Sequence, residues 1–194
     1  MSDLFGEDYY KTVNYVDFLQ RKGRYVKLAE DIDSLLEKLN LNNGPVLDFG
    51  CAVGFVVEAM EDRGYEDVCG VDISEWAVSQ CKEKGLNVTT EVDYDTDWGL
   101  TFCLDVLEHM TIEEVEDFLD NLKTEVIVFR VPVCAEEGED YVLECSRRDP
   151  THTIRWTSEQ WTELMEYHGY VVLSMNLPTI YSSEGVFAGL AIAL

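Results

Sequence analysis

The sequence predicts an α/β fold, with a layered sheet that has parallel strands at its centre and helices on both faces. Apolar segments alternate five times with segments of helical periodicity, which is the pattern of strand–helix–strand units. The first apolar run, VLDFGCAVG at 46–54, breaks into glycine and small residues, as a buried strand does before a helix. The last two apolar runs have no helix between them, which favours an antiparallel hairpin at one edge.

The opening segment, about 9–40, has the spacing of a helix. Tyr25, Leu28 and Ile32 begin a series of apolar residues three and four positions apart. The breaker residues of 42–45, Asn-Asn-Gly-Pro, end it.

Capping residues set the bounds of the later helices. Ser74 is a good N-cap and Gly85 a good C-terminal stop for one helix, and Thr111 with Glu114 makes a capping box for another. The predicted strands are 46–50, 67–72, 86–92, 100–106, 126–133, 170–176 and 186–194, and the other predicted helices are 54–63 and 158–168.

Size and composition indicate one globular domain of 194 residues, with 46% apolar residues. No stretch has the ~20 apolar residues that span a bilayer, so we expect no membrane partner. The acidic N-terminus does not have the pattern of a signal peptide. Six scattered cysteines without a CxxC pair indicate reduced thiols in the cytoplasm and argue against a zinc site.

The charge balance is strongly acidic. The chain has 14 basic and 39 acidic residues, a formal charge of −25. Such a surface repels phosphate backbones, so we expect no duplex nucleic acid as partner. A surface that keeps the protein soluble explains this charge better than the steering of a cationic substrate does.

The first strand and the turn after it have the pattern of a nucleoside-cofactor site. Gly50 and Gly54 permit positive φ and a close approach of the backbone to a ligand. The helix that starts there presents unpaired N–H donors. Asp72, at the end of the second strand, is placed to accept hydrogen bonds from a ribose diol.

Four segments in this order resemble the class I S-adenosylmethionine-dependent methyltransferases. They are VLDFGCAVG at 46–54, GVDIS at 70–74, LDVLEHM at 104–110, and the helix at 158–168 followed by GYVVLSM. The resemblance covers about 46–194 and implies a Rossmann-like seven-stranded sheet in the order 3-2-1-4-5-7-6, with strand 7 antiparallel. It also implies S-adenosylmethionine as the cofactor.

The resemblance assigns cofactor contacts to the glycine turn. Gly50, Ala52 and Gly54 would line the methionine part, and Asp48 would support the loop or contact the cofactor amine. Ala52 replaces the usual middle glycine, and its methyl group is tolerable if its φ is negative. Further implied contacts are Asp72 to the ribose hydroxyls, Ile73 to the adenine, Asp93 (or Asp95) to the adenine amino group, and Asp105 or Leu104 near the sulfonium.

Two of the three histidines are catalytic candidates. His152 lies in a polar segment that, in this fold, commonly covers the substrate, so it is a candidate base or substrate contact. His109 is a second candidate base; it can instead hold its loop, or pair with Glu108 around a metal ion as the resemblance allows. We expect no metal site. His168, at the end of a helix, is interpreted as structural.

The predicted organisation is a single methyltransferase domain over 1–194, with a helical cap at 1–44 and a substrate-covering insertion at 133–156. The paired Tyr9 and Tyr10 resemble a leading segment that covers the cofactor. The arginines of the insertion either bind an anion or pair with the carboxylates of 136–140.

The sequence therefore predicts an S-adenosylmethionine-dependent methyltransferase that acts on a small molecule, at oxygen or nitrogen. The alternative is a non-catalytic cofactor-binding regulator or partner subunit. A nicotinamide-dependent oxidoreductase is disfavoured, because no hydride-transfer set such as Tyr-x-x-x-Lys is present. The oligomeric state is not indicated.

Overall fold

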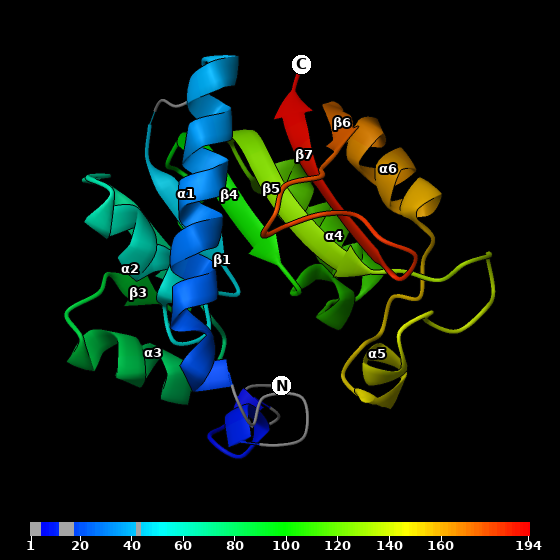
Figure 1. Cartoon of the computed structure of the whole chain (residues 1–194), viewed down its shortest axis with the longest axis horizontal. Helices are drawn as coiled ribbons and strands as arrows, with labels where there is room; N and C mark the ends of the chain where they lie inside the picture. The colour runs from blue at the N-terminus through cyan, green and yellow to red at the C-terminus, as the bar shows by residue number, and fades with distance from the viewer. Residues whose placement is uncertain (1–4, 12–17, 42–43) are drawn as a thin grey trace. The chain divides into compact units, whose positions relative to one another are not determined.

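The computed structural model describes residues 5–11, 18–41 and 44–194. Seven strands form one sheet in the order β3-β2-β1-β4-β5-β7-β6, which confirms the predicted order (Figure 1). The elements in chain order are η2 (Tyr9–Lys11), η3 (Phe18–Arg21), α1 (Lys22–Leu39), β1 (Val46–Phe49), α2 (Phe55–Asp62), β2 (Val68–Val71), α3 (Glu75–Glu83), β3 (Val88–Thr89), β4 (Trp98–Leu104), η4 (Leu107–His109), α4 (Ile112–Asn121), β5 (Thr124–Pro132), α5 (Glu144–Arg148), α6 (Ser158–Tyr167), β6 (Tyr170–Ser174) and β7 (Val186–Ala193).

The chain divides within β4 into two compact units, Met1–Thr101 (unit 1) and Phe102–Leu194 (unit 2). The prediction of a single domain with a helical cap and an insertion stays a prediction.

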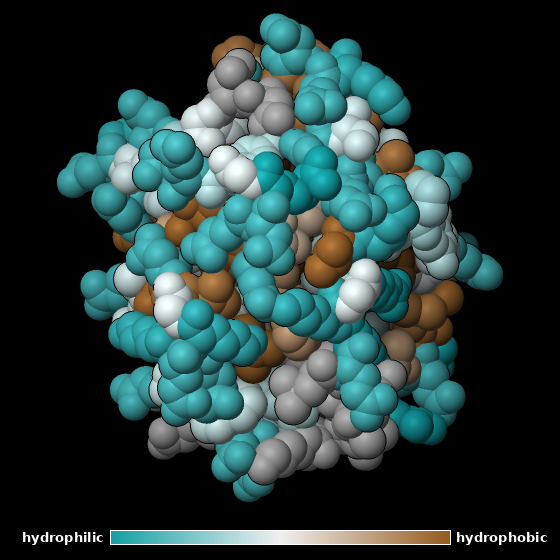
Figure 2. All heavy atoms as spheres, turned by 60° about the vertical axis from the view of Figure 1, so that its left-hand side comes forward, coloured by the Kyte–Doolittle hydropathy of each residue, from teal (hydrophilic) through white to brown (hydrophobic). Residues whose placement is uncertain are grey.

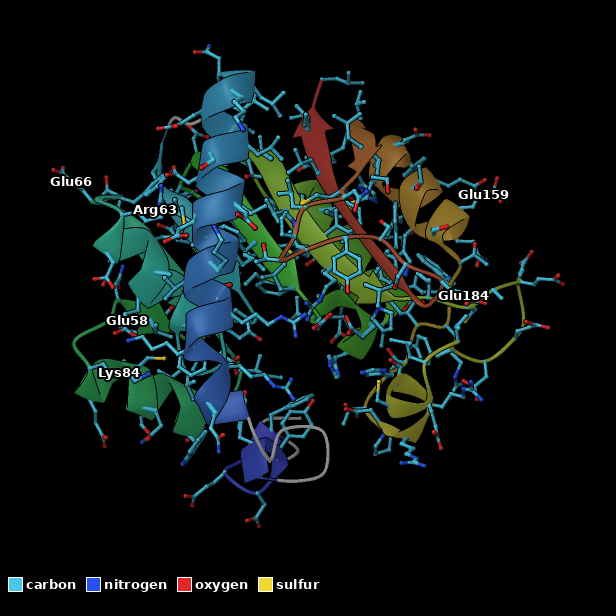
Figure 3. All side chains as sticks on the ribbon, viewed as in Figure 1. Glu58, Arg63, Glu66, Lys84, Glu159 and Glu184 are labelled. Atoms are coloured by element: carbon cyan, nitrogen blue, oxygen red, sulfur yellow. The ribbon has the colours of Figure 1, made fainter. Side chains whose placement is uncertain are left out.

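In unit 1, β2 pairs in parallel with both β1 and β3. Helices α1 and α2 are joined through Asp33, a buried acid of α1 whose carboxylate accepts hydrogen bonds from Arg63 and from the Tyr65 hydroxyl. A buried carboxylate is stable only when paired in this way. Lys22 of α1 also pairs with Glu58 of α2, which is labelled in Figure 3.

In unit 2, β7 is antiparallel to both β5 and β6, which confirms the predicted C-terminal hairpin. The apolar residues of β5, VIVF at 126–129, are buried and pair with residues 189–192 of β7, as the hydrophobic run in the sequence predicts. Helix α6 buries Trp161 and Met165.

Three elements differ from the sequence prediction. The α-helix predicted from residue 9 begins at Lys22, where the apolar series starts; residues 12–17 of that prediction lie outside the described residues. The strand predicted at 86–92 is only Val88–Thr89, because the chain turns at Thr89, whose hydroxyl donates to the Glu91 carbonyl. Helix α5 was not predicted, since five residues are too few to show a period.

The face of the molecule in Figure 2 is largely hydrophilic, as the charge predicts. Figure 2 shows a face on which hydrophilic side chains dominate and hydrophobic ones form small separate patches. Glu66, Glu159 and Glu184 are exposed and point away from the ribbon in Figure 3. Among the helices of the described ranges, none combines the length and apolar composition needed to cross a bilayer.

The capping box of α4 gives a test of this local structure. The Thr111 hydroxyl accepts from the Glu114 amide, and the Glu114 carboxylate accepts from the Thr111 amide. Thr111→Ala removes the cap and should lower the free energy of unfolding by about 1 kcal/mol in chemical denaturation. Thr90→Ala, at an exposed position outside any helix, is the control and should change it by less than about 0.5 kcal/mol. Equal losses of unfolding free energy in Thr111→Ala and Thr90→Ala would show that the cap does not stabilise the helix.

Candidate functional site

The turn between β1 and α2 is held against the end of β2 by its backbone. The amides of Gly50 and Cys51 both donate to the Val71 carbonyl, at 2.8 and 3.0 Å. Gly50 and Gly54 have φ of 77° and 78°, the left-handed region that glycine enters at little cost. A Cβ on Gly54 would also lie 2.7 Å from a methyl carbon of Leu86, so only glycine fits there.

Asp72 faces this turn. Its Oδ2 accepts from the Ala52 amide and its Oδ1 from the Ser74 amide, both at 2.8 Å. The side chain is buried, and burial raises its pKa while these two amides lower it. Each carboxylate oxygen keeps a second lone pair for a further donor. Asp72 therefore anchors the turn and still has lone pairs that can accept hydrogen bonds from a ligand.

Ala52 does not have the negative φ that was expected to make its methyl group tolerable. Its φ is +48°, not negative, so a residue with a Cβ occupies the left-handed region. This conformation costs roughly 1–2 kcal/mol and persists only where neighbours hold it. The Asp72 carboxylate holds the Ala52 amide, and the Cys81 thiol contacts the Ala52 carbonyl at 3.4 Å.

Two groups complete the support of the turn. Lys84, labelled in Figure 3 and not predicted from the sequence, donates to the Val53 carbonyl at 2.7 Å and lies over the Phe55 ring. Tyr10 is buried against Val53 and Phe55 and stacks on Trp76, and Tyr9 packs against the same cluster. No spacing signal links these residues to the turn, because they reach it only in the folded chain. The prediction that Tyr9 and Tyr10 belong to a segment that covers the cofactor stays a prediction.

Asp48, at the end of β1, is buried, and burial raises its pKa to about 8, with the nearby Asp72 carboxylate adding to the shift. The protonated group is neutral at pH 7. A cationic ligand group beside it would favour the ionised form. This fits the predicted contact with a cofactor amine.

The other predicted adenosine contacts are differently placed. Ile73 is 48% exposed, an unusual state for a large apolar side chain and one that a flat ring can cover. Asp93 is exposed, and its carboxylate accepts from the Asp95 amide and the Thr96 hydroxyl, so it stabilises its own loop. Its contact with adenine stays a prediction.

Asp105, which follows β4 in unit 2, is tied to Arg130 of β5. Its carboxylate accepts from the Arg130 Nε at 2.8 Å and from a second guanidinium nitrogen, and its amide donates to the Arg130 carbonyl. Its φ is +54°, a left-handed conformation that these bonds hold in place. The predicted position near a sulfonium stays a prediction.

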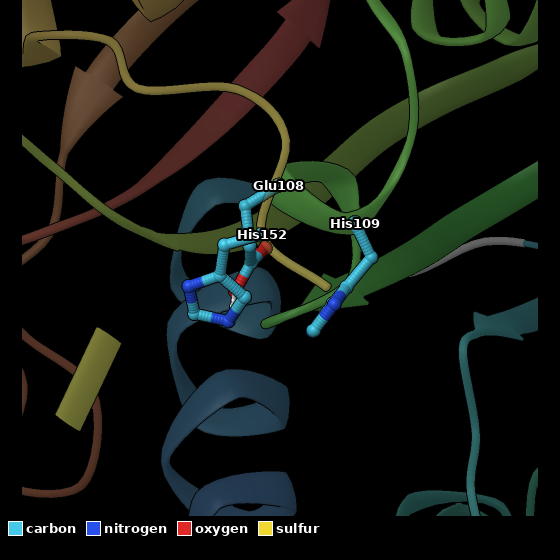
Figure 4. Close-up of side chains that lie close together, drawn as sticks. All are labelled: Glu108, His109 and His152. Atoms are coloured by element: carbon cyan, nitrogen blue, oxygen red, sulfur yellow. Dashed lines mark ion pairs between the residues drawn. The ribbon is translucent and has the colours of Figure 1, made fainter. Parts of the chain in front are cut away.

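Glu108, His109 and His152 come together in unit 2, and Figure 4 shows the three side chains converging. One ligand atom from each lies within 4.8 Å of the others. Glu108 is 1% exposed, and the rings of His109 and His152 meet edge to face at 4.6 Å. The two histidines named from the sequence therefore share one site, together with a carboxyl group that had been only a possible partner.

Backbone bonds bring His152 to this place. The amides of Thr153 and Ile154 both donate to the Glu108 carbonyl, at 2.8 and 3.4 Å. The Tyr141 hydroxyl, which is buried, donates to the Ile154 carbonyl at 2.6 Å. Tyr141 is thus a core residue that fixes the segment.

A hydrogen-bonded relay orients His109. The Thr151 hydroxyl donates to the Asp149 carboxylate, so its oxygen accepts from His109 Nδ1, 2.8 Å away. This network assigns the proton of the neutral imidazole to Nδ1 and its lone pair to Nε2. Hydrogen bonds from Thr151 keep the pKa of Asp149 below its usual value, against the effect of burial.

Burial favours the neutral form of all three side chains of the cluster. It raises the pKa of Glu108 well above its usual value, and the Asp105 carboxylate adds to this. It lowers the pKa of His109 to about 4, helped by His152. It also lowers the pKa of His152, although Asp149 acts in the opposite direction. Both imidazoles therefore offer lone pairs.

The arginines of the insertion have local partners. Arg155 pairs with Asp140, Arg148 with Glu144, and Arg147 donates to the Val142 carbonyl. Pairing with nearby carboxylates and carbonyls therefore explains them, and the alternative of a bound anion has no support here.

Comparison with known families identifies the chain. The model of a family described as "Methyltransferase domain" matches residues 19–175, so the chain belongs to this family, as the resemblance predicts. A search of the curated proteins finds no match.

Solved structures share the fold. A SAM-dependent methyltransferase from Archaeoglobus fulgidus has a TM-score of 0.60 at 19% identity, covering 84% of this chain and 94% of that one. Magnesium protoporphyrin IX methyltransferase from Synechocystis PCC 6803, with bound SAH, has a TM-score of 0.66 at 17% identity, and the match covers 100% of this chain and 98% of that one. The methyltransferase domain of bacterial CtHen1-C has a TM-score of 0.61 at 17% identity, and the match covers 88% of this chain and 98% of that one. The α/β class and strand order are thus those of known methyltransferases.

The raised pKa of Asp48 predicts a pH dependence of stability. The folded chain holds this proton up to about pH 8, whereas the group ionises at 3.8 when unperturbed. The stability from protonated Asp48 is complete below that lower value and is lost as the pH rises to about 8. Asp48→Asn cannot ionise, so its unfolding free energy relative to the wild type should rise by about 1.4 kcal/mol per pH unit between about pH 5 and 7. Urea denaturation at several pH values measures this.

The control for Asp48 is Asp95→Asn, at an exposed position. The difference in unfolding free energy between Asp95→Asn and the wild type should stay constant over the same pH range. A constant difference for Asp48→Asn as well would show that Asp48 does not bind a proton more tightly in the folded state.

Proposed function

We propose that this chain transfers the methyl group of S-adenosylmethionine to a small molecule, at an oxygen or nitrogen atom. The observation that carries the proposal is the turn at Gly50–Gly54 closed onto the carboxylate of Asp72. The similar methyltransferase from Synechocystis binds SAH, the demethylated form of this cofactor. Bound S-adenosylmethionine supplies an activated methyl group on a good leaving group.

The residues of unit 1 fit this cofactor. Asp72 has carboxylate lone pairs left for the ribose hydroxyls, and exposed Ile73 gives the adenine an apolar surface. Asp48, Gly50, Ala52 and Gly54 would hold the methionine part, with Asp48 facing the cationic amine. Charge on that amine would draw the proton from Asp48, so cofactor binding would release a proton near neutral pH.

The residues of unit 2 would serve the methyl acceptor. His109 and His152 carry lone pairs, which an acceptor hydroxyl needs nearby to lose its proton. For a neutral amine, positioning alone supplies much of the acceleration. A charge of −25 disfavours polyanionic acceptors, so a small molecule is the proposed class. The six free thiols, four of them buried, support a cytoplasmic location.

Cofactor binding is the first test. Isothermal titration of the purified chain with S-adenosylmethionine or its demethylated product should show saturable binding. Asp72→Ala should weaken it by roughly 2–4 kcal/mol, about 30- to 1000-fold, because hydrogen bonds to a charged group are lost. Ile73→Ser, which leaves the turn intact, should weaken it by about 10-fold through lost apolar contact.

The matched control is Asp67→Ala, which removes the same charge from an exposed position near the start of β2 and should bind as the wild type does. Absence of binding by the folded wild-type chain would refute the proposal. Binding without transfer of a labelled methyl group to any component of a metabolite extract would favour the non-catalytic regulator instead.

A further inference from the structure

The Glu108–His109–His152 cluster leaves one buried polar atom unexplained. In the described part of the chain, Glu108 Oε2 has no hydrogen bond of ordinary geometry. The Glu108 side chain is 1% exposed and that of His152 is 10% exposed. Buried polar atoms are nearly always satisfied, so Glu108 Oε2 needs a partner that the chain itself does not supply.

The distances within the cluster fit a shared ion better than a direct bond. His152 Nε2 lies 4.0 Å from Glu108 Oε1, too far for a hydrogen bond. Two ligand atoms bound to one metal ion at about 2.1 Å lie up to about 4.2 Å apart. The three candidate ligand atoms all lie within 4.8 Å of one another, close to this separation.

The surroundings of His109 are those of a metal ligand. Metal-binding histidines commonly donate their second ring N–H to an oxygen that fixes the ring. The Asp149–Thr151 relay does this for His109, accepting from Nδ1 and aligning Nε2 for a ligand. Asp149 Oδ2 also lies 3.8 Å from His152 Nε2, so a second carboxylate borders the cluster.

We propose that Glu108, His109 and His152 bind one divalent transition-metal ion, which holds a hydroxyl oxygen of the methyl acceptor at an open coordination position. Two imidazole nitrogens and one carboxylate oxygen suit zinc, cobalt, manganese or iron better than magnesium. Three protein ligands leave room for a further oxygen. The sequence analysis expected no metal site, although it left Glu108 and His109 as a possible pair around a metal ion; His152 joins them only in the folded chain.

The second half of this proposal rests on the proposed function and specifies its acceptor as a hydroxyl. Coordination lowers the pKa of a bound hydroxyl, so its O–H bond breaks and the proton leaves to water. The oxygen then forms the new O–C bond as the methyl–sulfur bond breaks, and that electron pair stays on sulfur. The cationic cofactor and neutral alcohol become the neutral thioether, the methyl ether and one proton.

Cobalt titration tests the site directly. The full chain, stripped of metal and carrying Cys145→Ser to remove its exposed thiol, is titrated with Co²⁺ and followed by visible d–d absorption and by calorimetry. We expect one ion per chain with nitrogen and oxygen ligands and no thiolate charge-transfer band. Glu108→Gln and His152→Asn should each weaken binding at least 100-fold, and Thr151→Val, which breaks the relay, about 10- to 100-fold.

The control is His168→Gln, because His168 bonds Asp120 outside the cluster, and it should bind Co²⁺ as the parent does. Circular dichroism checks that each variant is folded, and Thr151→Val keeps all three ligands should a ligand variant not fold. Absence of Co²⁺ binding by the folded parent, or equal binding by His152→Asn and His168→Gln, would overturn the proposal.

Titration of the metal-free chain with S-adenosylmethionine separates the two proposals. Metal binding that depends on Glu108 and His152, in a chain that binds no cofactor, would support the metal site and refute the proposed function. Cofactor binding in a chain that binds no Co²⁺ would support the proposed function and refute the metal site.

Discussion

The hydrogen bond from the Ala52 amide to the Asp72 carboxylate is the contact on which the turn after β1 depends. It joins the turn after β1 to the residue after β2, and it holds Ala52 in a conformation that an isolated residue would leave. Because the acceptor is a carboxylate, the bond is stronger than one to a neutral oxygen. The shape of the turn and the position of the acid are thus set together.

Most of the fold was predictable because its signals are local. Buried strands such as Val46–Phe49 and Thr124–Pro132 are mostly apolar, and the caps at Ser74 and Thr111 need only their next few residues. The short strand Val88–Thr89 was overestimated, since its β-branched residues are typical of a strand whether or not a neighbour pairs with them.

The candidate site was predictable in its residue types but not in its contacts. Asp72 and the glycines stand out in the sequence, whereas the left-handed Ala52 depends on bonds from Asp72 and Cys81 that are distant along the chain. His109 and His152 were both named, yet their meeting with Glu108 depends on a backbone bond between residues 108 and 153. Long-range bonds of this kind leave no periodic trace in a sequence.

The attachment of residues 153 and 154 to the Glu108 carbonyl uses main-chain atoms on both sides. Main-chain pairing tolerates almost any side chain, so the exposed residues 135–139 can vary in composition without moving His152, provided that Tyr141 keeps its buried bond to the Ile154 carbonyl. The sequence of this exposed loop and the position of the histidine are thereby set by separate parts of the chain.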